Sequence, residues 1–318
     1  MSPTISLVCT VRDEADNIGA LLDSMLAQTR PPDEIVVNDC LSRDATPAIV
    51  RAYAEREPRI RLVAGGHNIS SGRNNAVREA RGTIIACTDA GLTLDPRWLE
   101  QIVAPIERGE ADLVGGFYRP APRTLFELTL GAVNYRELGE LDPATFLPFG
   151  NSMAFRKELW ARVGGFPEWL SHCEDLVFDL EAERQGFRRA FAPGAVINFR
   201  PRGSLRAFAR QYFLYARGDG LAGLWPRRHA ARYLAYGGLA ALLLAAARLP
   251  WARWPAAALV AAGAAGYTRG PYRRLWGRLR GRPAHEWARA LALVPLIRLV
   301  GDLAKLAGYP VGLLRRRR

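Results

Sequence analysis

Residues 5–39 read ISLVCTVRDEADNIGALLDSMLAQTRPPDEIVVND, and this stretch decides the fold. It begins with an apolar β-branched run, passes through a polar loop, and then carries apolar residues at helical spacing over 18–28. It ends in a second apolar run at 34–39. Short runs of this kind are typical of buried strands, and Pro31 and Pro32 end the helix between them. The stretch therefore predicts a strand–helix–strand unit.

The same alternation continues along the chain. Further helices are expected at 45–57, 71–82 and 96–108, and further strands at 59–65, 83–91 and 111–118. This order predicts a doubly wound, mostly parallel α/β sheet covered on both faces, with residues 120–200 completing the same domain. Ligands of such sheets bind beyond the carboxyl ends of the strands. Those ends carry the polar residues Thr10, Asn38, Asp39, Thr88 and Asp89.

The charge of the chain is strongly positive. Its 318 residues include 44 Lys and Arg against 31 Asp and Glu, and Arg dominates from residue 188 onward. Such an excess indicates a polyanion or an anionic membrane as partner. A nucleic-acid-binding protein is one alternative, but the arginines cluster beside apolar segments. That placement favours an anionic lipid surface and no nucleic acid.

Cysteine usage and the first residues indicate the compartment. The four cysteines are far apart and form no CxxC pair, which argues against a zinc site or a disulfide framework. We expect a cytoplasmic catalytic part. The first residues, MSPTISLVCT, lack a basic region and a long apolar stretch, so no signal peptide is expected.

The tail after residue 225 has a different character. Apolar stretches at 233–247 and 255–267 are each shorter than the ~20 residues of an ordinary spanning helix, and basic clusters flank the pair. Under the positive-inside rule they predict a hairpin over 233–267 with both flanks cytoplasmic. Residues 287–314 predict an amphipathic or spanning helix. We therefore expect a catalytic domain at 1–225 and a membrane-associated tail at 226–318, which would place the protein at the cell membrane.

Five segments carry a specific resemblance. They are CTVRDEADNIGALLDSMLAQTRPPDEIVVNDCLSRDAT, SSGRNNAVREARG, TDAGLTLDPRWLE, GNSMAFRKELWARVGGFPE and CEDLVFDLEAERQG. In this order, over roughly residues 4–225, the chain resembles the inverting glycosyltransferase family 2, whose fold is called GT-A. The resemblance implies transfer of a sugar from a nucleotide-diphosphate donor.

The resemblance also implies donor contacts at the strand ends. Matching positions place Thr10, Arg12 and Glu14 near the nucleoside. Asp39 matches a carboxylate that accepts from the N3–H of uracil, which favours a UDP-type donor. Arg73 stands at the start of a helix, where it would contact an anion or a base edge, although a surface pair with Glu79 or another carboxylate is the alternative.

Glu174 and Asp175 match the family's Glu-Asp motif, in which the Asp is the general base. Inverting transfer needs one carboxylate to take the proton of the acceptor hydroxyl. Acidic residues that complement a helix N-terminus are the alternative interpretation. The resemblance places Asn151 and Ser152 on the sugar and acceptor side, and the sequence suggests His172 as an acceptor contact. Arg217 is expected to contact the pyrophosphate.

The metal position departs from the family pattern. The family has Asp-x-Asp where this chain reads Asp89-Ala90-Gly91, and Asn198 stands where many members have a histidine ligand. Asp89 remains as the candidate ligand of a divalent cation, Mg²⁺ or Mn²⁺, which would be weakly bound or absent. Arg200, Arg202 and Arg217 would then offset the charge of the diphosphate.

The sequence thus predicts an inverting glycosyltransferase that acts on a hydroxyl or phosphate acceptor, either lipid-linked or part of a cell-envelope glycan. A nucleotidyltransferase is an alternative, but residues 10–17 lack its Gly-rich phosphate loop. A Rossmann dehydrogenase would need GxGxxG after the first strand, which is missing. A non-catalytic sugar-binding scaffold is a further alternative, because Gly91 offers no ligand.

Overall fold

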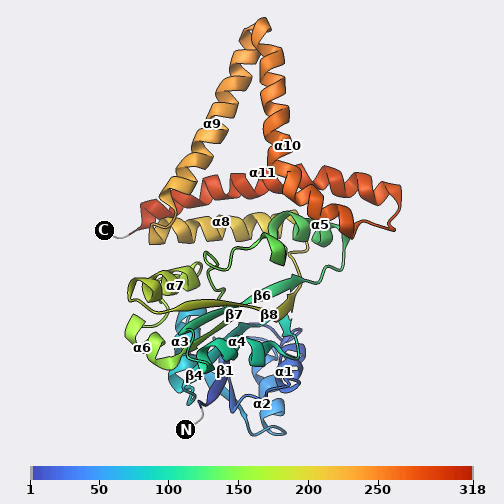
Figure 1. The fold of residues 1–318 in the computed structure, drawn as a ribbon. Helices are drawn as coiled ribbons and strands as arrows, with labels where there is room; N and C mark the ends of the chain where they lie inside the picture. Colours follow the sequence, from blue (N-terminus) through green and yellow to red (C-terminus); the bar gives the residue numbers. More distant parts are fainter. Residues whose placement is uncertain (1–2, 317–318) are drawn as a thin grey trace. The chain divides into compact units, whose positions relative to one another are not determined.

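The computed structural model describes residues 3–316, and these form two compact units (Figure 1). The first, which we call the sheet unit, comprises residues 1–121 and 138–200. The second, the tail unit, comprises residues 122–137 and 201–318. Helix α5 (Leu125–Asn134) and helix α8 (Leu205–Ala222) group with the tail helices and not with the sheet. The compact unit around the sheet therefore ends before residue 225, where the sequence suggested a domain boundary.

The sheet unit is built on one mixed sheet with the strand order β3-β2-β1-β4-β7-β6-β8-β5. Its strands are β1 Ile5–Val11, β2 Glu34–Asp39, β3 Ile60–Ala64, β4 Ile84–Asp89, β5 Leu92–Leu94, β6 Leu113–Pro120, β7 Ser152–Arg156 and β8 Arg189–Phe199. Strands β1 to β4 pair in parallel, as expected. Strand β7 runs antiparallel between β4 and β6, and β5 runs antiparallel to β8.

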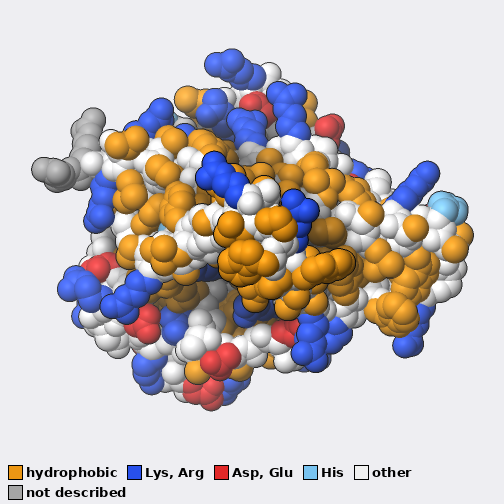
Figure 2. Space-filling view, turned by 90° about the horizontal axis from the view of Figure 1, so that it is seen from above, with side chains coloured by type: hydrophobic (Ala, Val, Ile, Leu, Met, Phe, Trp, Pro, Cys, Tyr) orange, Lys and Arg blue, Asp and Glu red, His pale blue; other side chains and the backbone are white. Residues whose placement is uncertain are grey.

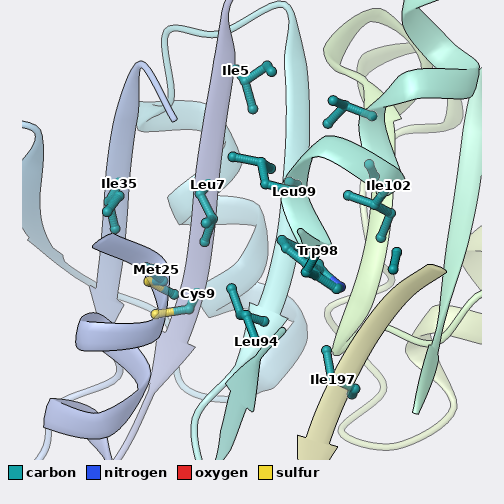
Figure 3. Close-up of a cluster of buried hydrophobic side chains, with 14 of the residues drawn as sticks. Ile5, Leu7, Cys9, Met25, Ile35, Leu94, Trp98, Leu99, Ile102 and Ile197 are labelled. Carbon is teal, nitrogen blue, oxygen red and sulfur yellow. The ribbon is translucent and has the colours of Figure 1, made fainter. Parts of the chain in front are cut away.

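Helices cover both faces of this sheet. They are α1 Ile18–Leu26, α2 Thr46–Ala54, α3 Ile69–Glu79, α4 Trp98–Glu107, α6 Lys157–Val163 and α7 Glu174–Arg184, with a short 3₁₀ helix at Leu138–Glu140. We call the apolar cluster beneath α1 and α4 the first core; Figure 3 shows Leu7 of β1, Met25 of α1 and Trp98 of α4 in it. The second core joins Val77 of α3, Leu159 of α6 and Phe178 of α7 to the other face. These two cores fix the strand ends, because burial of both faces specifies the register.

All four cysteines are buried in the sheet unit. Cys9 and Cys87 face opposite cores on neighbouring strands β1 and β4. Burial raises the pKa of the Cys87 thiol to about 12 and that of Cys9 further still. These thiols are therefore protonated packing groups.

The tail unit consists of long helices. After α5 and α8 come α9 Pro226–Arg248, a 3₁₀ turn at Pro250–Ala252, α10 Arg253–Arg278 and α11 Ala284–Arg315. Helices α8 and α11 lie side by side, and α9 and α10 rise from them as a hairpin (Figure 1). Asp302 of α11 joins the hairpin's base: it accepts from Arg232 Nε at 3.1 Å and from the hydroxyls of Tyr236 and Tyr267.

The hairpin exposes large apolar side chains. Leu234 and Leu244 of α9 are 77% and 60% exposed, and Trp254 of α10 is 84% exposed. Figure 2 shows hydrophobic side chains crowded at the centre of the view, with Lys and Arg side chains among and around them. Within the described residues, α9 is the one helix long and apolar enough to cross a membrane. Its apolar window has no buried residue, so it is not a core helix.

Candidate functional site

The carboxyl ends of β1, β2 and β4 bring the expected strand-end residues together. In the parallel register, Thr10 lies beside Asn38 on one side and beside Asp89 on the other. Asn38 is held by the Gly65 carbonyl at 2.9 Å and by the Asn75 side chain at 2.7 Å. The hydroxyl of Thr10 is buried and has no hydrogen-bond partner among residues 3–316. A buried hydroxyl without a hydrogen-bond partner, at the end of a strand, is suited to contact a ligand.

Two loops that carry donor candidates are joined by short hydrogen bonds. The carboxylate of Asp13 accepts from the Arg43 amide at 2.7 Å, and Thr46 Oγ1 accepts from the Glu14 amide at 2.8 Å. Asp39 accepts from the Ser42 amide at 3.1 Å and is 5% exposed. A carboxylate has about four acceptor positions, so Asp39 retains capacity for a base edge. Glu14 accepts from Asn17 at 2.8 Å, and the exposed Arg12 lies near Asp13.

Arg73 is the buried centre of the site. Its side chain is 2% exposed, and it does not pair with Glu79. Nη1 donates to Glu174 Oε1 at 2.8 Å, and Nη2 donates to Asp89 Oδ1 at 2.9 Å. The guanidinium also stacks over Phe166, 5.2 Å from the ring centre. Arg73 thus bridges the end of β4 and the start of α7.

Gly150 fits closely against this bridge. A Cβ on Gly150 would stand 2.6 Å from Arg73 Nη1, which is too close for any side chain. The Gly150 amide donates to Asp175 Oδ2 at 3.0 Å, while the Leu176 amide donates to Oδ1 at 2.9 Å. The Asp175 carboxylate is therefore oriented by two backbone donors, and it remains partly exposed at the first turn of α7. A carboxylate that is oriented by backbone amides and still partly accessible could accept a proton from a substrate.

Glu174 has an environment unlike that of Asp175. It is 6% exposed, and burial together with the neighbouring Asp175 raises its pKa to about 7, although Arg73 opposes this shift. One turn later, Asp179 is 1% exposed, and neither of its oxygens has a partner in the described part of the chain. Burial raises the pKa of Asp179 well above its usual range. Asp179 could not be identified from the sequence, because an acidic residue in a charged helix is expected to be solvated.

The acceptor-side candidates separate into different environments. Ser152 is 1% exposed, and its hydroxyl accepts from the Trp98 indole at 2.9 Å, so it anchors β7 to α4. Asn151 is half-buried, with an Oδ1 that has no partner among residues 3–316. His172 lies two residues before Glu174, with Nδ1 3.2 Å from Ser171 Oγ. Arg217 belongs to the tail unit, half-buried on α8.

The expected metal position offers few ligand side chains among the described residues. Within residues 3–316, no three His, Cys, Asp or Glu side chains come together as a ligand group. Asp89 is neutralised by Arg73 through both of its oxygens. Gly91 has a φ of +80° and no side chain, and the Asn198 amide oxygen lies 3.5 Å from Arg119 Nη1. Mg²⁺ is usually bound by one or two carboxylates together with water and substrate phosphates, and the one carboxylate here, Asp89, is paired with Arg73.

Comparisons with known proteins agree with this architecture. The family model "Glycosyl transferase family 2" matches residues 6–161, and "Glycosyl transferase family group 2" matches residues 84–268. The chain is 28% identical over 200 residues to the uncharacterized glycosyltransferase EpsJ of Bacillus subtilis, covering 59% of this chain and 58% of that protein. It is 26% identical over 275 residues to the succinoglycan biosynthesis protein ExoA of Rhizobium meliloti, covering 80% and 83%. The match thus spans less than two thirds of EpsJ but most of ExoA.

A solved structure with a similar fold is the mannosyltransferase PcManGT from Pyrobaculum calidifontis in complex with GDP-Man and Mn²⁺. The TM-score is 0.64 and the identity 26%, and the alignment covers 96% of this chain and 88% of that one. The sheet, the position of Asp89 and the Glu-Asp pair at the start of α7 fit the same assignment. The chain belongs to the family 2 glycosyltransferases and has their GT-A fold.

Proposed function

We propose that the protein transfers a sugar, with inversion, from a nucleotide-diphosphate donor to a hydroxyl or phosphate acceptor. The main support is the Arg73 bridge, whose two ion pairs join Asp89 at the end of β4 to Glu174 at the start of α7. The bridge links Asp89 to Glu174, the neighbour of the proposed base Asp175, and this supports one site for donor and base. The family assignment sets aside the nucleotidyltransferase alternative.

In the proposed reaction Asp175 is the general base. It takes the proton of the acceptor hydroxyl as the oxygen attacks the anomeric carbon. The bond from that carbon to the phosphate oxygen breaks, and the nucleoside diphosphate leaves with the electron pair. Two backbone amides orient Asp175 for this step, and such positioning is a large part of what acid–base catalysis requires. Glu174 acts as a positioning residue through Arg73.

The nucleotide is proposed to lie on Thr10, Arg12, Glu14 and Asp39. A uracil or guanine ring offers an N–H that the Asp39 carboxylate can accept. UDP-type donors remain the first choice from the resemblance, and the Pyrobaculum neighbour binds GDP-Man. Screening both classes of donor is therefore the first step of the assay.

The acceptor is proposed to be a lipid-linked or cell-envelope glycan at the membrane, with the sheet unit on the cytoplasmic side. The exposed apolar hairpin supports a membrane location, since an uncovered apolar surface of this size in a soluble monomer would be unusual. Relatives named for succinoglycan and O-antigen biosynthesis support a polysaccharide product.

Replacement of Asp175 by Asn tests the proposed base. Asn keeps the size of the side chain but cannot accept a proton. We expect turnover to fall by about 10²–10⁴-fold, the usual contribution of general base catalysis, while nucleotide affinity stays within about threefold. Turnover would be measured as release of nucleoside diphosphate with the full chain in membranes.

Glu181→Gln is the matched control, because Glu181 lies on the same helix and pairs with Arg184 away from Asp175. This variant should keep normal turnover. Retention of about a third or more of the wild-type turnover in Asp175→Asn would rule out Asp175 as the base.

A further inference from the structure

The next-to-last residue of strand β6 is an exposed cation, Arg119, which lies beside the position where the family has a metal ligand. In the sheet register Asn198 of β8 lies between Arg119 of β6 and Thr93 of β5. Arg119 Nη1 lies 3.5 Å from Asn198 Oδ1. Arg200 follows directly at the end of β8 and is also exposed. Cationic side chains are thus concentrated at this corner of the sheet.

Arg119 points to the same face of the sheet as Asp89. Its neighbour Tyr118 packs against the first core, and side chains alternate along a strand, so Arg119 faces the other way. Cys87 belongs to the second core, and Asp89, two residues on, shares its face. Arg119 and Asp89 therefore both project from the face that carries α3 and α7.

The chain also brings Arg119 close to the turn after β4. Asp89 and Leu92 are three residues apart, hence at most about 10 Å between their Cα atoms. Leu92 pairs with Phe199, the residue after Asn198. Gly91, inside this turn, is exposed, and a Cβ built on it would meet nothing within 4 Å. The turn is therefore open on the side of Gly91.

At this turn, cationic side chains stand where a metal site would have anionic ligands. A cation such as Mg²⁺ is usually held by one or two carboxylates together with water and substrate phosphates. Here both oxygens of Asp89 accept from Arg73, and residues 3–316 hold no group of three His, Cys, Asp or Glu side chains. A guanidinium binds phosphate oxygens directly, in a planar bidentate geometry. We propose that Arg119, positioned by Asn198, binds the donor's diphosphate in place of a divalent cation, so that nucleotide binding needs no metal. This rests on the proposed function.

Calorimetry of UDP and GDP binding tests the proposal with the full chain in detergent. After treatment with EDTA, the nucleotide that binds should do so with an affinity within about threefold of that in excess Mn²⁺. Arg119→Ala should weaken binding about tenfold or more in EDTA, the loss of one charge-assisted contact. Arg97→Ala is the control, because Arg97 is an exposed arginine of the same unit that pairs with Glu100.

The outcomes separate this inference from the proposed function. Binding that appears only with Mn²⁺, or an Arg119→Ala variant that binds like the wild type, would overturn the role of Arg119 alone. No binding of either nucleotide under any condition would instead contradict the proposed function.

A double variant, Gly91→Asp with Asn198→His, should restore two ligands and make Mn²⁺ tighten binding about tenfold or more. Asp is among the residues that tolerate the positive φ at this position. An unchanged response to Mn²⁺ would contradict the view that these two positions are what the site lacks.

Discussion

At the scale of single residues, Arg73 connects parts of the site that are distant in the sequence. Its two carboxylate partners lie 16 and 101 residues away along the chain. Residue type and position near a helix start singled out Arg73 from the sequence. The sequence could not predict that Arg73 is buried between two carboxylates, because local sequence patterns do not show which distant residues pair. The same holds for Asn198 and Arg119, which meet only through the pairing of β6 with β8.

Glu174 provides a pH-dependent prediction. Its pKa is raised to about 7 in the folded protein, so the folded state keeps this proton in a range where the unfolded state has lost it. Stability should therefore fall as pH rises from about 4.5 to about 7 and stay reduced above that. In Glu174→Gln this loss is removed. The advantage of the variant over the wild type in thermal unfolding temperature should grow between pH 5 and pH 8.

The comparison uses the same detergent and salt at each pH. A difference between Glu174→Gln and the wild type that stays constant from pH 5 to pH 8 would show that Glu174 is ionised throughout.

At the scale of elements, helix α3 determines where Arg73 sits, and its start is a capping box. Asn68 Oδ1 accepts from the Ser71 amide at 2.9 Å, and Ser71 Oγ accepts from the Asn68 amide at 3.1 Å. Asn68 Nδ2 also donates to the Glu168 carbonyl at 2.7 Å, which ties α3 to the loop before α7. Both contacts stabilise the stretch that presents Arg73 to Glu174.

Asn68→Ala should destabilise the protein by about 1–2 kcal/mol, because it removes a side-chain cap and a loop contact. Denaturant unfolding of the sheet unit, followed by tryptophan fluorescence of the full chain, measures this loss. Asn17→Ala is the matched control: Asn17 precedes α1 at the same position but makes no side-chain cap. Equal losses in the two variants would show that the capping contact contributes nothing.

The sequence predicted most helices and parallel strands of the sheet unit, since their apolar periodicity is strong. Strand β5 went unassigned because Leu92–Leu94 is too short to show a period. The antiparallel insertion of β7 between β4 and β6 was missed for another reason: chain order alone does not fix which strand a later strand joins. Strand β5 follows the Asp89 turn and pairs with β8 at Asn198, so the corner proposed to bind diphosphate was the least predictable part.

At the scale of the whole molecule, the apolar tail was evident in the sequence, but its helices extend beyond the apolar stretches. Residues 233–247 span about 22 Å as a helix, less than the ~30 Å of a bilayer core. Exposed Trp251 and Trp254 mark the turn between α9 and α10, and aromatic residues of this kind favour the membrane interface. The grouping of α5 and α8 with the tail was not predicted, because the change to an Arg-rich composition near residue 188 does not indicate where either helix packs.

Charges placed on the hairpin should release the protein from membranes. Leu244→Asp combined with Leu259→Asp puts two carboxylates on exposed apolar positions, at about 2.5–3.5 kcal/mol each near the bilayer centre. The fraction that floats with anionic vesicles in a density gradient should fall strongly. Leu138→Asp, an exposed leucine of the sheet unit, should float like the wild type. Unchanged flotation of the double variant would exclude the hairpin as the membrane contact.

The burial of all four cysteines has a practical consequence for the hairpin. Because each native thiol is packed inside the sheet unit and those of Cys9 and Cys87 are held protonated, a maleimide probe should find little to modify on the native protein. A cysteine introduced at Trp251 would then be the single reactive thiol. A spin label or fluorophore attached there can report directly how deep the turn between α9 and α10 lies in a lipid bilayer, without removal of any native residue from the cores.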